Sequence, residues 1–197
     1  MPRRISDILN ELEKQNLDGL LIFSDANIAY LTNYLSRESI LLVSPSGNVF
    51  ITDSRYTQEA RHYLKNLASV VTINGSLSET IALTLRNHKL KTVGFEAAFL
   101  SYARFINLRK NTKAQKISLR PVIGLIEKYR QIKNPEEIKA IRKSCHISLK
   151  TLAFIKNKIR PGKTELEIAA EIERFIRCNG ARMSSFEIIV ASGPHSA

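Results

Sequence analysis

Residues 39–73 have the sequence SILLVSPSGNVFITDSRYTQEARHYLKNLASVVTI, and their hydrophobic pattern changes period twice. Two apolar runs of strand length, 39–43 and 48–52, flank the turn sequence Pro-Ser-Gly-Asn, which predicts a β-hairpin. Apolar residues at 56–67 then recur at helical spacing, and the β-branched residues of 69–73 favour a further strand. A hairpin that is followed by a helix and a strand indicates an α/β domain with a mixed sheet.

The sequence on both sides of this segment continues the alternation of helices and strands. Ser101 is a suitable residue to cap the last helix of the series, since its hydroxyl can accept a backbone N–H bond. The predicted elements are a helix at 5–17, a strand at 19–23, a helix at 77–87, a strand at 92–95 and a helix at 101–110. We therefore predict an α/β domain over residues 1–120.

A second unit is predicted for residues 121–197, because a proline and a glycine interrupt the periodic pattern where it begins. A short helix at 125–131 precedes Asn134, which is followed by proline and two glutamates and therefore suits the start of a long helix. Cys145 lies on the apolar stripe of that helix, and we interpret it as a core residue. The remaining predictions are a helix that begins with the capping box Thr164–Glu167 and ends at Gly180, and a strand at 185–191.

The chain of 197 residues carries 30 basic and 18 acidic residues, a net charge of +12, which raises the question of a nucleic-acid partner. One basic run, at 104–120, contains no acid. It consists of Arg104, Arg109, Lys110, Lys113, Lys116 and Arg120. No zinc-finger spacing or RNA-binding aromatic motif accompanies it, so we interpret the run as a solvated helix face and do not expect a nucleic-acid partner.

Neither a membrane nor an export pathway is indicated by the apolar pattern. No apolar stretch approaches the roughly 20 residues that a membrane-spanning helix needs. The charged start of the sequence lacks the apolar region of a secretion signal, and two widely spaced cysteines, Cys145 and Cys178, do not form a disulfide framework. We therefore expect a cytoplasmic protein.

No motif assembles a catalytic centre when the residues are considered alone. The sequence lacks a phosphate-binding loop, a dinucleotide fingerprint, an HExxH zinc helix and a GxSxG elbow. Glu167 and Glu171 share one helix face and could together hold a metal, but this spacing is more often that of a solvated helix surface. The residues alone predict neither a catalytic group nor a metal ligand.

The order and spacing of several motifs, however, resemble the Xaa-Pro aminopeptidases and Xaa-Pro dipeptidases (prolidases), relatives of creatinase and methionine aminopeptidase. Asn33 and Tyr34 depart from the usual Gly-Phe of the first motif. The similar segments are NIAYLTNY at 27–34, TDSRY at 52–56, LIEKYRQIKNPEEI at 125–138, PGKTE at 161–165 and SFEIIVASG at 185–193.

This resemblance implies a mixed-sheet, creatinase/prolidase-like N-terminal α/β domain, residues 1–120, followed by the truncated start of an α+β pita-bread catalytic domain, residues 121–197. It implies hydrolysis of the bond between an N-terminal residue and proline. In the family, two divalent ions (manganese, cobalt or zinc), held by two Asp, one His and two Glu, activate the water. The resemblance places all these ligands beyond the segment 185–193. We therefore expect no metal ligand, no catalytic residue and no peptidase activity in this chain.

A few residues receive lesser roles from the resemblance and from their local chemistry. Asp53 is expected to cap the helix that follows it and Arg55 to pair with it, so that these two residues and Tyr56 have a structural role. Phe186 and His195 are expected to lie at most at the edge of a substrate pocket. The strand that carries Phe186 would lack sheet partners, and unpaired apolar strands tend to aggregate or to seek another chain.

Three functions are considered, and the least favoured of them is nucleic-acid binding through the basic run at 104–120. The first is the N-terminal portion of a proline-specific metallo-aminopeptidase, for which a peptide substrate is a partner only in the intact enzyme. The second is a non-enzymatic module derived from that family, in which the N-terminal domain makes contacts between subunits of a homo-oligomer.

Overall fold

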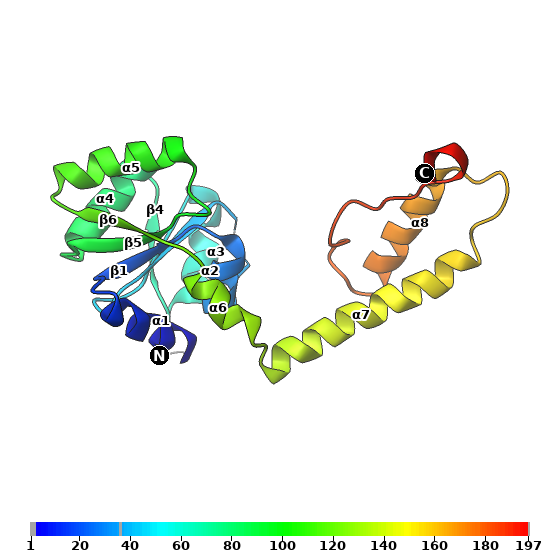
Figure 1. Cartoon of the computed structure of the whole chain (residues 1–197), viewed down its shortest axis with the longest axis horizontal. Coiled ribbons are helices and arrows are strands. Elements are labelled where there is room, and N and C mark those ends of the chain that lie inside the picture. Colours follow the sequence, from blue (N-terminus) through cyan, green and yellow to red (C-terminus); the bar gives the residue numbers. More distant parts are fainter. Residues whose placement is uncertain (1–2, 36, 197) are drawn as a thin grey trace. The chain divides into compact units, whose positions relative to one another are not determined.

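The computed structural model describes residues 3–35 and 37–196 and divides into two compact units, Met1–Gln131 and Ile132–Ala197 (Figure 1). The sequence placed the boundary at 120/121. The first unit extends further because the strand β6 (Ser118–Val122) pairs with the sheet, and because Ile126 of the helix α6 (Leu125–Gln131) lies in its core.

The first unit alternates helices with the strands of a single sheet. Before β6 and α6 it contains α1 (Arg3–Lys14), β1 (Gly19–Ile22), α2 (Asp25–Thr32), β2 (Ser39–Val43), β3 (Val49–Thr52), α3 (Ser54–Leu64), β4 (Ser69–Thr72), α4 (Leu77–Asn87), β5 (Thr92–Glu96) and α5 (Tyr102–Ala114). The strand order is β4-β3-β2-β1-β5-β6. The strand β2 is antiparallel to β1 and β3, and the other neighbours are parallel. The predicted hairpin and mixed sheet are therefore confirmed.

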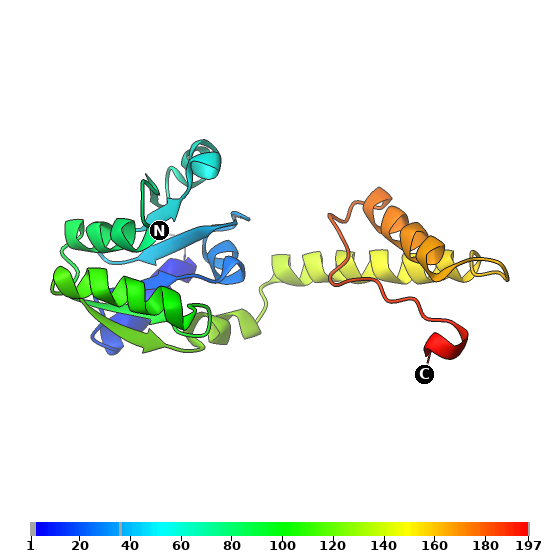
Figure 2. The same ribbon diagram turned by 90° about the horizontal axis from the view of Figure 1, so that it is seen from above.

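Helices cover both faces of this sheet, as Figures 1 and 2 show. Successive side chains of β1 point to opposite faces of the sheet. Leu20 and Ile22 join the core under α1, α2, α3 and α6, whereas Leu21 joins the core under α4 and α5. Because both faces are buried, strands such as β1 and β2 are continuous apolar runs and show no alternation of apolar and polar residues.

The topology brings the starts of four helices to one edge of the sheet. The strands β1, β3, β4 and β5 run in the same direction, and α2, α3, α4 and α5 follow them in that order. Their N-cap residues are Ser24, Asp53, Ser76 and Ser101. In open α/β sheets, ligands bind outside the carboxyl ends of the strands, so this edge is the first place to look for a site.

The second unit holds α7 (Pro135–Lys156), α8 (Glu165–Cys178) and a short 3₁₀ helix at Gly193–Ser196. The predicted capping boxes at Asn134 and Thr164 are both present. The two long helices pack through Phe154 and Phe175, whose stacked ring centroids are 4.2 Å apart.

Two predictions for this unit are wrong. Residues 185–191 form no strand, because the described part of this unit offers no second strand to complete a hydrogen-bond ladder. Cys145 is exposed, because no element among the described residues of this unit packs over that side of α7. None of the described helices is long and apolar enough to cross a membrane.

Candidate functional site

A cavity of about 900 Å³ in the first unit opens at the carboxyl ends of β1, β3 and β4, and we call it the carboxyl-edge cavity. Its wall includes apolar side chains from the sheet and from the helices behind it, among them Ile51 and Leu108. Six charged residues also line it: Asp25, Arg37, Glu38, Asp53, Arg55 and Arg104. The cavity thus combines an apolar base with charges of both signs.

Asp53, Arg55 and Tyr56 form one rigid turn in the wall of this cavity. The Asp53 carboxylate accepts the backbone N–H of Arg55 at 2.8 Å and caps α3. The Arg55 guanidinium donates back to the same carboxylate, with Nη2 2.6 Å from Oδ2, and lies 5.2 Å from the centre of the Tyr56 ring. The hydrogen bond from the Arg55 side chain lowers the pKa of Asp53, so the carboxylate stays charged at neutral pH.

The loop that precedes β2 brings two further charges to the cavity. Glu38 has a φ of +54°, a left-handed conformation that costs a residue with a side chain about 1 kcal/mol. Its carboxylate reaches Arg55, with Oε2 3.8 Å from Nη2. Arg37 is exposed beside it. Sequence reasoning missed both residues, because nothing in their local pattern predicts that this loop lies beside the Asp53 turn.

A buried polar cluster lies where β5 ends. Glu96 is 6% exposed, and its Oε2 accepts the backbone N–H groups of Phe23 and Ser24, each at 2.8 Å. Its Oε1 accepts the side-chain amide of Asn27 at 2.5 Å. The carboxylate therefore fixes the turn between β1 and α2 to the end of β5.

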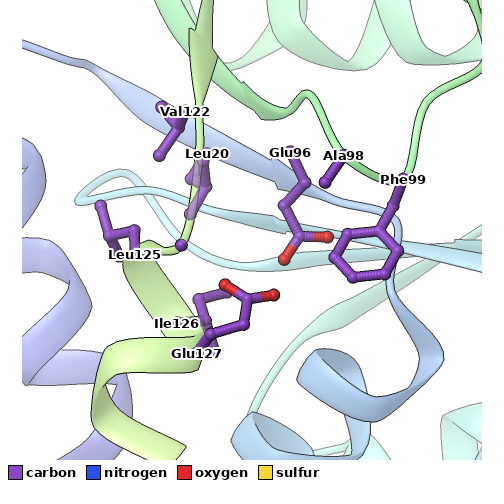
Figure 3. Close-up of a pocket in the computed structure, with 9 residues that line it drawn as sticks. Leu20, Glu96, Ala98, Phe99, Val122, Leu125, Ile126 and Glu127 are labelled. Atoms are coloured by element: carbon purple, nitrogen blue, oxygen red, sulfur yellow. The ribbon is translucent and has the colours of Figure 1, made fainter.

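Asn27 connects this carboxylate to α6. Its amide nitrogen also donates to Glu127 Oε1 at 2.7 Å, and its Oδ1 accepts from Arg130 Nη1 at 2.7 Å. Figure 3 shows the Glu96 and Glu127 carboxylates facing each other across a cavity of about 10 Å³. A space of that size holds one water molecule and no larger ligand. Burial raises the pKa of Glu96, as does the charge of Glu127, while the three hydrogen bonds oppose the rise.

The two residues that the sequence assigned to a pocket edge lie in the second unit. The Phe186 side chain is 76% exposed and is not part of a strand. His195 lies in the 3₁₀ helix with its Nδ1 3.5 Å from Glu165 Oε1, which also accepts the backbone N–H of Ser192 at 2.7 Å. Glu165 therefore holds this loop against the start of α8.

Among residues 3–35 and 37–196, no three His, Cys, Asp or Glu side chains gather closely enough to hold an ion. Glu167 and Glu171 are engaged by cations instead, at 2.7 Å from Lys163 and 3.1 Å from Arg174. These residues therefore do not fit a two-metal centre.

Comparison with known proteins gives two family matches that follow one another along the chain. The Creatinase/Prolidase N-terminal domain matches residues 4–132, and Metallopeptidase family M24 matches residues 139–197.

Individual relatives cover the whole chain but are themselves about twice as long. The uncharacterized peptidase YqhT of Bacillus subtilis is 32% identical over 194 residues, which are 98% of this chain and 54% of that protein. The Xaa-Pro dipeptidase of Pyrococcus horikoshii is 28% identical over 199 residues, with 100% and 54% covered. The structure of an Xaa-Pro dipeptidase from Bacillus anthracis superposes with a TM-score of 0.87 at 30% identity, with 98% and 53% covered.

The chain thus spans about half the length of the curated relatives it matches. The six-stranded mixed sheet, the two family matches and the agreement with a solved dipeptidase structure all support the same family assignment. This chain belongs to the creatinase/prolidase family, with a Creatinase/Prolidase N-terminal domain joined to a segment that matches Metallopeptidase family M24.

Proposed function

We propose that this chain is the N-terminal portion of a proline-specific metallopeptidase that hydrolyses the Xaa-Pro bond at peptide N-termini, and that the chain by itself is inactive. The observation that carries the proposal is the coverage. The chain matches Xaa-Pro dipeptidases along its whole length while spanning about half of theirs. The two divalent ions of the intact enzyme, manganese, cobalt or zinc, would then be held by residues outside this chain.

The surface of the second unit supports this proposal. Several large apolar side chains on α7, on α8 and in the turn between them are exposed, and Leu149 and Leu166 are the most exposed of these at 66% and 80%. The others are Ile138, Ile141, Leu152 and Ile159. Apolar side chains at helical spacing normally face a core, so we propose that the rest of the M24 domain packs on this surface.

A peptidase assay combined with metal titration tests the proposal. The chain is incubated with an Xaa-Pro dipeptide and manganese, and manganese binding is measured by calorimetry. We expect no turnover and no tight, stoichiometric binding of two ions. The Pyrococcus horikoshii dipeptidase, assayed under the same conditions, is the positive control. Turnover by the isolated chain at a comparable rate would refute the proposed inactivity.

A second candidate function is an interaction module, in which the first unit forms homo-oligomers. It is supported by the exposure of Leu35 and Tyr63, at 72% and 65%, beside Tyr34, whose ring stacks on that of Tyr63 at 5.5 Å. Light scattering of the purified chain, compared with a Leu35→Glu, Tyr63→Glu variant, tests it. A dimer that the variant converts to a monomer supports the module, and a monomeric wild type counts against it.

We also propose a cytoplasmic location. Both cysteines, Cys145 and Cys178, are free and exposed, which suits a reducing compartment.

A further inference from the structure

A second cavity of the first unit, about 380 Å³, is lined by residues of α5, of the edge strand β6 and of the turn between them, and we call it the basic groove. Its base is apolar and includes Phe105, Ile117 and Leu119. Its rim is cationic, with Arg109, Lys113 and Lys116. The groove is separate from the carboxyl-edge cavity and from the Glu96 cluster.

The cations of the rim are not neutralised by neighbouring acids. Arg109, Lys113 and Lys116 are exposed, and within the described ranges none of them forms an ion pair. The chain contains no acidic residue from 104 to 120. The two arginines of α8, Arg174 and Arg177, are in contrast paired with glutamates. The groove therefore presents an uncompensated positive field above an apolar surface.

The strand β6 leaves part of its backbone available at the same place. The Ser118 N–H bonds to Lys91, and the Val122 carbonyl accepts from Ala97, so alternate residues of β6 face β5. Leu119 and Pro121 consequently face the open edge, where Leu119 offers both an N–H and a carbonyl. Proline lacks an N–H, so Pro121 prevents a long strand from pairing here but leaves the Leu119 position open.

These features select one class of partner. We propose that the basic groove binds an extended acidic peptide segment of another protein, whose apolar side chains contact Phe105 and Leu119 while its carboxylates face the cationic rim. A nucleic acid is a less suitable ligand, because the apolar base of the groove forms no favourable contact with charged phosphates. Phe105 is the one aromatic side chain that lines the groove, and one face of its ring already stacks on Phe95 with the centroids 5.1 Å apart, so the groove offers no series of rings on which successive bases could stack. A second copy of this chain is disfavoured at this cationic rim because each copy carries a net charge of +12, whereas the homo-oligomer contact proposed above uses the apolar side chains of Leu35 and Tyr63.

The test uses the full chain and a fluorescent peptide of alternating glutamate and leucine residues, with binding followed by anisotropy. A Lys113→Glu, Lys116→Glu variant should weaken binding at least about tenfold. Lys139→Glu, Lys143→Glu, which makes the same change of charge on exposed positions of α7, should change it less than about twofold. Circular dichroism of each variant confirms that it is folded.

A third variant and two competitors separate the alternatives. Leu119→Ser should weaken binding of the glutamate–leucine peptide, because the leucines of this peptide contact the apolar base. An all-glutamate peptide, which should bind more weakly to wild type, should bind the variant equally well. Equal loss in both charge-reversed variants would show unspecific attraction and overturn the proposal. A single-stranded RNA of equal charge that binds more tightly than the peptide would also overturn it, and so would absence of binding at low salt.

Discussion

A single buried acid, Glu96, joins three elements of the first unit. Its carboxylate is the acceptor for two backbone N–H groups and one side-chain amide, and the two backbone N–H groups would lose their acceptor without it. The strand predicted from the sequence, 92–95, ends one residue before this acid. A glutamate after an apolar strand is usually solvated, and only the fold shows that this one is buried.

Replacement of this carboxylate should be costly. We expect Glu96→Ala to lower the free energy of unfolding of the first unit by about 3 kcal/mol, because it leaves buried donors unsatisfied. Urea unfolding at neutral pH measures the change. Glu13→Ala, at an exposed position of α1, is the control and should stay within about 0.5 kcal/mol of wild type. A similar small change for Glu96→Ala would mean that water replaces the carboxylate.

The same residue should make stability depend on pH. Burial raises the pKa of Glu96 above its ordinary value of 4.5, so the folded state binds the proton more tightly than the unfolded state. The stability of wild type relative to Glu96→Gln should therefore fall as pH rises from 4.5 through the raised native pKa, and then stay constant. Urea unfolding of both proteins across this range gives the difference.

Two charged groups of α6 face this site, Glu127 directly and Arg130 through Asn27. A Glu127→Gln background should reduce the pH dependence, because the charge of Glu127 contributes to the raised pKa. A wild type that gains stability over Glu96→Gln as pH rises through this window would show that the pKa is lowered instead.

At the scale of elements, helix starts were predictable and the last strand was not. The sequence predicted caps at Ser101, Asn134 and Thr164, and each side chain accepts a backbone N–H of its own helix. A cap depends on residues within one turn, so local sequence specifies it. A strand at 185–191 depends on a partner strand, which local sequence cannot supply.

The cap of α3 can be separated from the ion pair that accompanies it. Asp53→Ala should lower the melting temperature of the first unit by a few degrees, because the Arg55 backbone N–H loses its acceptor. Asp53→Asn keeps an acceptor oxygen and should retain most of the stability. Arg55→Ala should have a smaller effect than Asp53→Ala, because an exposed ion pair contributes little. Calorimetry of the three variants compares these effects, and equal losses for Asp53→Asn and Asp53→Ala would assign the stabilisation to the pair.

At the scale of the whole molecule, the two units differ in how much they bury. The first unit has an apolar core on each face of its sheet. The buried apolar residues of the second unit, within the described ranges, are Ile147, Ile155 and Ile168. Stability within one chain need not be uniform, and the unit with fewer buried apolar contacts opens more readily.

Hydrogen exchange should reveal this difference. We expect backbone amides of β1 and β5 to exchange only through global unfolding of the first unit, and those of α8 to exchange at least about tenfold faster. Mass spectrometry of peptides from both regions measures the rates. Amides of α8 that are as protected as those of β1 would show that the exposed apolar residues of the second unit are covered in solution, for example by another copy.

The sequence by itself determined the hairpin, the alternation of helices and strands, the helix caps and the family, because periodicity, turn residues and motif order are local properties. The tertiary structure alone decided that Glu96 is buried with Asn27, that the loop of Arg37 and Glu38 reaches the Asp53 turn, and that a basic run borders an apolar groove. Each of these depends on segments far apart in the chain, which the pairing of strands in the sheet brings together.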